Sequence, residues 1–194
     1  PTCMKLAVAE KGLMVIDCYA YGKSGHAAHN GGENALYKAL DDIQILRNYR
    51  FDKKSELLGS VKITITQINA GSQHNVIPDI CNFVADIRTN EHYTNKKIVK
   101  IIKSRIESDI KPRSFKLNSS VIGLDHPFVM KAKEAGIEMF GSSTTSDQAI
   151  MSFPSVKIGP GDSSRSHTAD EYVFKSEILK RIELYIELLD GLVI

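Results

Sequence analysis

The chain has 194 residues, of which 42% are hydrophobic and 25% charged, and its net charge is +2. These values are typical of a globular protein with a buried core, and they argue against wholesale disorder. The small net charge argues against nucleic acid or an anionic membrane surface as a partner, and no apolar run approaches the ~20 residues of a membrane span.

Two further features indicate a cytoplasmic protein. The three cysteines, Cys3, Cys18 and Cys81, form no close pair, which argues against a disulfide scaffold or a zinc ribbon and favours a reducing compartment. Glu10 and Lys11 interrupt the first apolar stretch, so the pattern predicts no signal peptide.

Strand and helix patterns alternate as far as residue 119. Residues 13–21, 60–69 and 77–88 repeat apolar side chains with a period of two, which predicts strands. Residues 33–48 and 94–110 repeat them every three or four positions, which predicts helices, and a short strand is expected near 114–119. The order β-α-β-β-α-β predicts a ferredoxin-like α+β domain with one four-stranded antiparallel sheet and two helices on one face.

The same periodicities predict which side chains are buried. The first strand is expected to bury one face, made of Met14, Ile16, Cys18 and Ala20. The first helix is expected to bury a stripe made of Leu36, Ala39, Leu40, Ile43 and Leu46 or Arg47. The second helix has an apolar side made of Ile98, Ile101, Ile102, Ile106 and Ile110, and its lysines predict a solvated face.

The pattern changes after residue 120. Asp125-His126-Pro127 predicts a helix start, and that helix is expected to end near Gly136. A polar loop (141–147), a short helix, a strand (155–159), a glycine- and serine-rich loop and a last helix follow. The last helix is expected to bury Ile178, Ile182, Tyr185, Ile186 and Leu189. Because one or two strands cannot cover these helices, the segment is predicted to belong to a larger sheet with strands upstream of Pro1.

Familiar catalytic motifs are absent. Gly22-Lys23-Ser24 resembles the end of a phosphate-binding loop, but Asp17 stands where that motif needs glycine. No GxSxG nucleophile elbow occurs. The six histidines lack metal-binding spacings such as HExxH, so spacing alone defines no metal site.

Three loops are nevertheless typical of a binding site. Residues 24–32 surround His26 with small side chains, residues 71–79 carry Asn75, and residues 159–172 carry His167. Small residues allow the backbone to approach a ligand closely, and loops that leave strands commonly carry sites. The loops predict a site without naming its reaction.

These segments together resemble the M20 family of di-zinc aminoacylases and peptidases. The resemblance rests on Pro1-Thr2, KGLMVIDCYAYGKSGHAAHNGGENA, NVIPDICNFVADIR, SSTTSDQAIM and GPGDSSRSHTADEYV, which follow in the family's order. The chain resembles the acetylornithine deacetylase and succinyl-diaminopimelate desuccinylase type, and its segments TTSDQ and SHTADEY are most similar to the acetylornithine and acetylcitrulline deacetylase branch. The resemblance implies a catalytic-domain remnant and linker (1–9), a lid and dimerisation domain (10–119) and the C-terminal part of a zinc-peptidase-like catalytic domain (120–194).

The resemblance also implies roles for individual residues. His167 matches the family's last zinc ligand, and His26 matches the lid histidine that stabilises the oxyanion in the partner subunit's active site. The positions that match substrate-contacting residues or close-approach glycines are Asn75, Arg88, Ser146, Asp147, Gly159 and Gly161. A homodimer through the lid is expected.

The implied reaction is hydrolysis of the amide bond of a small N-acyl amino acid by two zinc or cobalt ions and a glutamate base. The upstream ligands and that base have no counterpart after Pro1, so the chain alone is predicted to bind no metal and to be inactive. The acyl group stays open. The alternative is a non-catalytic dimerisation or binding module, which would have no use for the His167 loop.

Overall fold

The structure, a computed structural model, describes residues 1–193, which form two compact units. The ferredoxin-like domain comprises Gly12–Ser119. The tail unit combines Pro1–Lys11 with the chain from Ser120 onward. No helix within residues 1–193 is long and apolar enough to cross a membrane.

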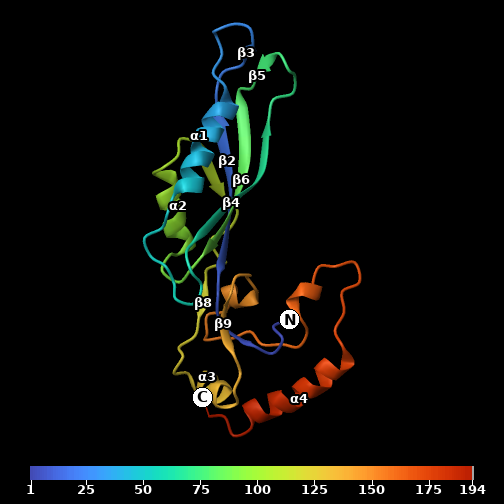
Figure 1. The fold of residues 1–194 in the computed structure, drawn as a ribbon. Helices are drawn as coiled ribbons and strands as arrows, with labels where there is room; N and C mark the ends of the chain where they lie inside the picture. The colour runs from blue at the N-terminus through green and yellow to red at the C-terminus, as the bar shows by residue number, and fades with distance from the viewer. Residues whose placement is uncertain (194) are drawn as a thin grey trace. The chain divides into compact units, whose positions relative to one another are not determined.

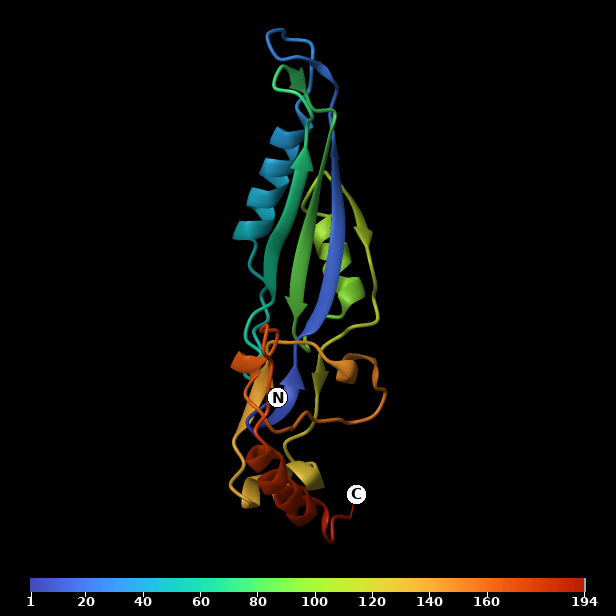
Figure 2. The ribbon, with the colours of Figure 1, turned by 90° about the vertical axis from the view of Figure 1, so that its right-hand side faces the viewer.

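The ferredoxin-like domain is a four-stranded antiparallel sheet with two helices on one face (Figure 1 and Figure 2). The strand order β4-β6-β2-β7 places the first and third strands of the β-α-β-β-α-β unit at the centre. This confirms the predicted fold class. The elements are β2 (Gly12–Tyr21), α1 (Ala35–Asn48), β4 (Lys62–Ala70), β6 (Ile80–Thr89), α2 (Asn95–Lys103) and β7 (Asp109–Pro112).

One face of the sheet forms the domain core. The predicted face of β2 is buried throughout, and β6 adds Cys81, Phe83, Ala85 and Ile87 to it. Each large apolar side chain of this kind contributes roughly 1.5–3 kcal/mol through burial. In α1 the prediction for Leu40 is wrong, since it is 47% exposed and Asp42 is buried instead. The stripe is centred on Ala35, Ala39 and Leu46.

The segment after α2 corrects two predictions. The helix ends at Lys103 rather than at residue 110, and Ile110 lies in β7, opposite Cys18 of β2. No strand forms at 114–119. The reason is tertiary: the buried Asp42 carboxylate accepts hydrogen bonds from the Glu107 and Ser108 amides and from the Ser108 hydroxyl, which fixes a turn before β7.

A second buried polar side chain fixes the start of α2. Asn95 is fully buried, and its Nδ2 donates to the carbonyl oxygens of Leu13 and Leu117 at 3.1 and 2.9 Å. Its Oδ1 accepts from the Thr89 hydroxyl, and its backbone N–H donates to Asn118 Oδ1. Asn95 therefore joins the helix start to β2, to β6 and to the segment after β7.

The tail unit is built on a three-stranded sheet in the order β8-β1-β9. Strand β8 is antiparallel and β9 is parallel to the central β1. Its elements are β1 (Leu6–Glu10), β8 (Ser120–Val121), α3 (Pro127–Glu134), β9 (Met139–Ser142), the 3-10 helices η1 (Asp147–Ile150) and η2 (Ser163–Arg165), and α4 (Lys175–Leu189). The start of α3 confirms the prediction, since the His126 side chain caps it and proline follows.

Two predictions for the tail unit are wrong. Residues 155–159 form no strand beyond a single bridge between Lys157 and Ala7, and the strands that pair with β1 are the unpredicted β9 and β8. Most of the expected stripe of α4 is exposed, since Ile182 is 50% and Ile186 63% accessible, whereas Tyr185 is half-buried and donates to the Ile158 carbonyl at 3.0 Å. Leu188 is the buried residue of α4, because α4 packs there on α3 and the 156–158 segment.

Candidate functional site

The loops that carry His26 and Asn75 lie together at one end of the ferredoxin-like domain. Strands β3 (Gly25–His26) and β5 (Val76–Ile77) pair in a separate two-stranded sheet, with His26 opposite Val76. The Ala27 N–H donates to the Asn75 carbonyl at 2.9 Å. The predicted strand 77–88 is therefore interrupted, since β5 belongs to this tip and β6 to the main sheet (Figure 1).

A close backbone contact explains the glycine before this tip. The Gly22 N–H donates to the Asp79 carbonyl at 2.8 Å, and Lys23 forms a bridge with Glu33. A Cβ at Gly22 would lie 2.1 Å from the Glu33 carbonyl oxygen. The glycine that resembled part of a phosphate-binding loop therefore serves chain packing.

The imidazole of His26 is oriented by its own loop. Its Nδ1 accepts a hydrogen bond from the Ala28 N–H at 3.2 Å, and the His29 ring lies 5.1 Å away between centroids. An accepting Nδ1 carries no hydrogen in a neutral imidazole, so the hydrogen resides on Nε2. The exposed ring thus presents an N–H donor at the tip.

Arg88 lies at the other end of the main sheet. Its guanidinium donates from Nε and Nη2 to both carboxylate oxygens of Asp86, at 2.8 and 3.0 Å. Ile80, at the tip end of β6, is eight positions earlier, or roughly 26 Å at the rise of an extended strand. Within one chain, the ferredoxin-like domain does not bring Arg88 to His26 and Asn75.

The two glycines predicted to approach a ligand, Gly159 and Gly161, contact the start of the chain. The Gly159 carbonyl accepts from the amides of Thr2 and Met4, and its N–H donates to the Thr2 hydroxyl at 3.0 Å. The Gly161 carbonyl accepts from the Cys3 N–H, and Gly161 has a φ of +81°, which favours glycine. Residues 1–4 and the 159–161 turn thus form one structure, although 155 residues separate them in the sequence.

The loop that carries His167 is fixed by an arginine the sequence did not single out. Arg165 donates from both terminal nitrogens to Glu177, at 2.9 and 2.7 Å, and its guanidinium stacks on Tyr172 and Phe174. The hydrogen bonds from Arg165, with one from the Phe174 amide, lower the pKa of Glu177 to about 2. His167 follows in a left-handed conformation with φ 62°.

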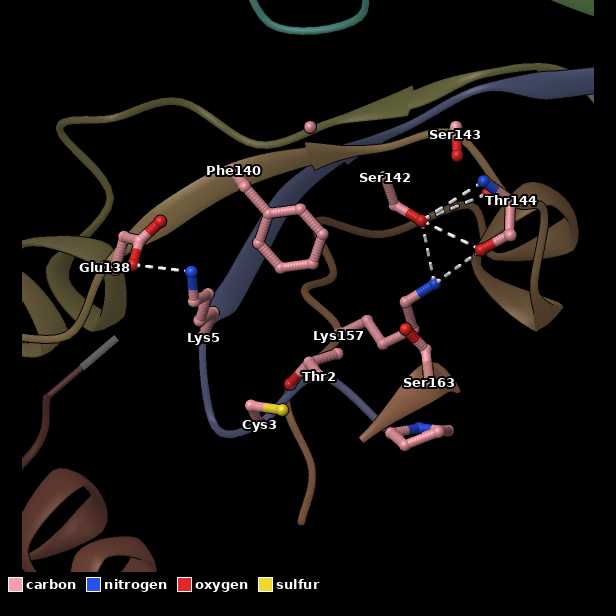
Figure 3. Close-up of a pocket in the computed structure, with 12 residues that line it drawn as sticks. Thr2, Cys3, Lys5, Glu138, Phe140, Ser142, Ser143, Thr144, Lys157 and Ser163 are labelled. Atoms are coloured by element: carbon pink, nitrogen blue, oxygen red, sulfur yellow. Dashed lines mark hydrogen bonds and ion pairs between the residues drawn. The ribbon is translucent and has the colours of Figure 1, made fainter. Parts of the chain in front are cut away.

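Ser146 and Asp147 lie where β9 leads into η1. The Ser146 side chain caps η1 and also donates to Glu10, and the Asp147 side chain is exposed. A cavity of about 440 Å³ adjoins this loop, and its lining includes serine and threonine side chains, Phe140 and two lysines, Lys5 and Lys157 (Figure 3). Sequence reasoning missed Glu10 and Lys157 here, although a carboxylate at the end of the apolar run LAVAE was a signal.

The described residues do not make a complete metal centre. Within residues 1–193, no three side chains of His, Cys, Asp or Glu are grouped so that they could hold a metal ion. His167 is the single ligand that the resemblance assigns, and structural and catalytic zinc sites use three or four protein ligands. The chain's own residues therefore do not fit the two metal ions implied by the resemblance.

The fold is similar to solved peptidase structures. The aminopeptidase PepT of Bacillus cereus matches 97% of this chain with a TM-score of 0.76 at 18% identity, and the match covers 54% of that chain. An M20 family metallo-carboxypeptidase of Sulfolobus solfataricus matches 95% with a TM-score of 0.71 at 14% identity, over 59% of its length. At these identities the likeness defines the fold class alone.

Sequence comparison identifies the family. A family model described as the M20 peptidase dimerisation domain matches residues 8–114, more than half of the chain. A succinyl-diaminopimelate desuccinylase of Orientia tsutsugamushi is 26% identical over 90% of this chain and 44% of its own length. An acetylornithine deacetylase of Buchnera aphidicola is 23% identical over 89% of the chain and 50% of its own length. The chain belongs to the M20 peptidase family, and it spans about half the length of these curated relatives.

Proposed function

We propose that the full-length protein hydrolyses the amide bond of an N-acyl amino acid, of the N-acetyl- or N-succinyl-ornithine or -citrulline kind. Family membership and the names of the relatives support a deacylase. The observation that carries the proposal is the tip of the ferredoxin-like domain, where His26 presents an Nε2–H donor beside Asn75. Such a donor fits a developing oxyanion, whose negative charge needs a fixed hydrogen bond.

The site residues outside the tail loops, with Ser146 and Asp147, have proposed roles in catalysis and substrate binding. His26 and Asn75 would act in the active site of the partner subunit. Arg88 would bind a substrate carboxylate in place of the Asp86 carboxylate, because its planar guanidinium group binds one carboxylate at a time. Ser146 and Asp147 would contact substrate.

The tail unit would supply the backbone and the metal ligand of the site. Gly159 and Gly161 would let the backbone pass close to the substrate. His167 is the metal ligand this chain would contribute, for zinc or cobalt. Because residues 1–193 contain no group of three His, Cys, Asp or Glu side chains that could hold a metal ion, we propose that the chain alone is inactive.

The proposed homodimer would form through the ferredoxin-like domain. Strand β4 is an edge of the sheet order β4-β6-β2-β7. Helix α1 presents Tyr37 and Leu40 at 66% and 47% exposure, apolar side chains that a partner would cover. Leu40→Glu is expected to convert the dimer to a monomer by light scattering, whereas Lys96→Ala, at an exposed position of α2, should leave it intact. A dimer that survives Leu40→Glu would refute this surface.

The deacylase proposal is tested by assaying the full-length protein on N-acetyl- and N-succinyl-ornithine and -citrulline. His26→Ala should lower kcat by about 100-fold or more, as loss of an oxyanion donor does. His167→Ala should lower both activity and bound metal. His92→Ala is the matched control, because His92 is an exposed histidine of the same domain. Unchanged rates in both test variants would contradict the assigned roles.

A non-catalytic dimerisation module is the second candidate. The family model that matches residues 8–114 describes a dimerisation domain, which favours it. The glycine turn joined to residues 1–4 and the Arg165-fixed His167 loop favour the enzyme, because pairing of two sheets needs neither. A full-length protein that dimerises but hydrolyses none of these substrates would favour the module.

A further inference from the structure

One buried carboxylate anchors the loop between β9 and η1. Glu10 is the last residue of β1, and 1% of its surface is exposed. Its Oε2 accepts from the Ser146 amide at 3.0 Å and from the Ser146 hydroxyl at 2.5 Å. Its Oε1 forms an ion pair with Lys157 Nζ. Both oxygens of Glu10 are thus directed at the loop and at a lysine beside it.

Lys157 extends this anchor along the loop. Its Nζ also donates to Ser142 Oγ at 3.0 Å and to Thr144 Oγ1 at 3.3 Å (Figure 3). The Thr145 hydroxyl donates to the Lys11 carbonyl, directly after β1, at 2.7 Å. Polar contacts to the end of β1 or to Lys157 therefore hold Ser142, Thr144, Thr145 and Ser146 of the loop.

Stability alone does not explain a charged pair at this position. Removing two charges from water costs free energy that their attraction often fails to exceed, so a buried ion pair is weak evidence of added stability. What the pair provides is a fixed loop that ends at Asp147. The Asp147 side chain is exposed and makes no hydrogen bond or ion pair with any other residue of the described chain.

We propose that Glu10 and Lys157 are positioning residues, which fix loop 142–147 for binding of the N-acyl amino acid. The inference rests on the proposed function, since it takes Ser146 and Asp147 to contact substrate. Glu10 acts through Ser146, and Lys157 acts through Glu10 and the loop hydroxyls. Neither positioning residue needs to touch the substrate.

The kinetic test compares Glu10→Gln with Glu138→Gln in the full-length protein. Glu138 is a matched control, because it pairs with Lys5 at 2.7 Å in the same unit but its side chain is 64% exposed. Glu10→Gln should raise KM by about tenfold or more with a smaller change in kcat, because loop 142–147 is no longer held in one position. Combined with Ser146→Ala, it should add little to the effect of Ser146→Ala alone.

Lys157 offers a second route if Glu10→Gln does not fold. Lys157→Met should raise KM in the same way, and Lys157→Arg, which keeps the charge, should restore most of the affinity. Variants that lower only the melting temperature and leave KM and kcat unchanged would show a merely structural pair and would overturn the proposal.

Hydrogen exchange tests the loop independently of catalysis. In the 194-residue chain, the peptide covering 142–147 should exchange faster in Glu10→Gln than in the wild type or in Glu138→Gln, because glutamine has a single acceptor oxygen and cannot serve both the Ser146 amide and Lys157. Equal exchange in all three proteins would refute positioning by Glu10. If the full-length protein hydrolyses no N-acyl amino acid, the proposed function fails, and exchange alone decides whether Glu10 fixes the loop.

Discussion

Replacing Asp42 with alanine tests how the ferredoxin-like domain turns from α2 into β7. The Asp42 side chain is 3% exposed, and its carboxylate accepts from the Glu107 amide at 3.1 Å, the Ser108 amide at 2.8 Å and the Ser108 hydroxyl at 2.5 Å. Asp42→Ala removes all three acceptor contacts at once. The hydroxyl can rotate to another acceptor, but the two amides are fixed by the backbone.

The expected loss follows from those two amides. A buried N–H left without an acceptor costs about 1–3 kcal/mol, so two of them cost about 2–5 kcal/mol once partial access of water at Glu107 is allowed for. Asp42→Asn keeps one acceptor oxygen and should lose about half as much. Asp41→Ala is the control, since Asp41 is the exposed neighbour on the same helix.

Urea denaturation with thiol trapping measures this loss of stability in the ferredoxin-like domain itself. Cys18 and Cys81 are both buried in the core of the ferredoxin-like domain, so their reaction reports its opening. Asp42→Ala should shift the midpoint to lower urea, and Asp41→Ala should not. A difference below about 0.5 kcal/mol between the two variants would refute the argument that these amides depend on Asp42.

Three further outcomes are expected. In the native chain the exposed Cys3 should react quickly with a thiol reagent at pH 8, whereas Cys18, whose pKa burial raises to about 12, should react only on unfolding. Fast reaction of all three thiols would contradict the burial of Cys18 and Cys81 in the core. The native pKa of Glu177 is about 2, against an ordinary 4.5, so its stabilising effect is complete above pH 4.5 and is lost as the pH falls toward 2. Glu177→Gln should therefore flatten the melting-temperature profile between these pH values, and an unchanged profile would argue against the pairing of Glu177 with Arg165. Asn95→Asp places a carboxylate against two carbonyl oxygens and should destabilise by about 2 kcal/mol or more in the same urea assay, whereas a near-neutral change would contradict the buried contacts.

Much of the ferredoxin-like domain could be predicted from periodicity. Alternation in β2 identified the buried face from Met14 to Ala20, because a strand turns successive side chains to opposite faces. The end of α2 could not be predicted, since residues 104–110 continue a helical pattern of isoleucines. The turn at Ser108 depends on Asp42, which is 66 residues away in the sequence.

In the candidate site too, some residues could be predicted from the sequence and others only from the folded structure. Loop composition alone pointed to His26, Asn75 and His167, because small residues around a polar side chain leave a local signature. Composition could not show that Arg88 is already bonded to Asp86, since only the folded strand determines which charges meet.

The order of the main elements of the ferredoxin-like domain, and the family, followed from the sequence, because periodicity and short motifs are properties of neighbouring residues. The tertiary structure decided which polar groups meet across long stretches of chain. Glu10 meets Ser146 across 136 residues, and Thr2 meets Gly159 across 157. The tertiary structure also leaves most of the apolar stripe of α4 exposed in the described part of the chain, since burial depends on what packs against a helix and not on the helix alone.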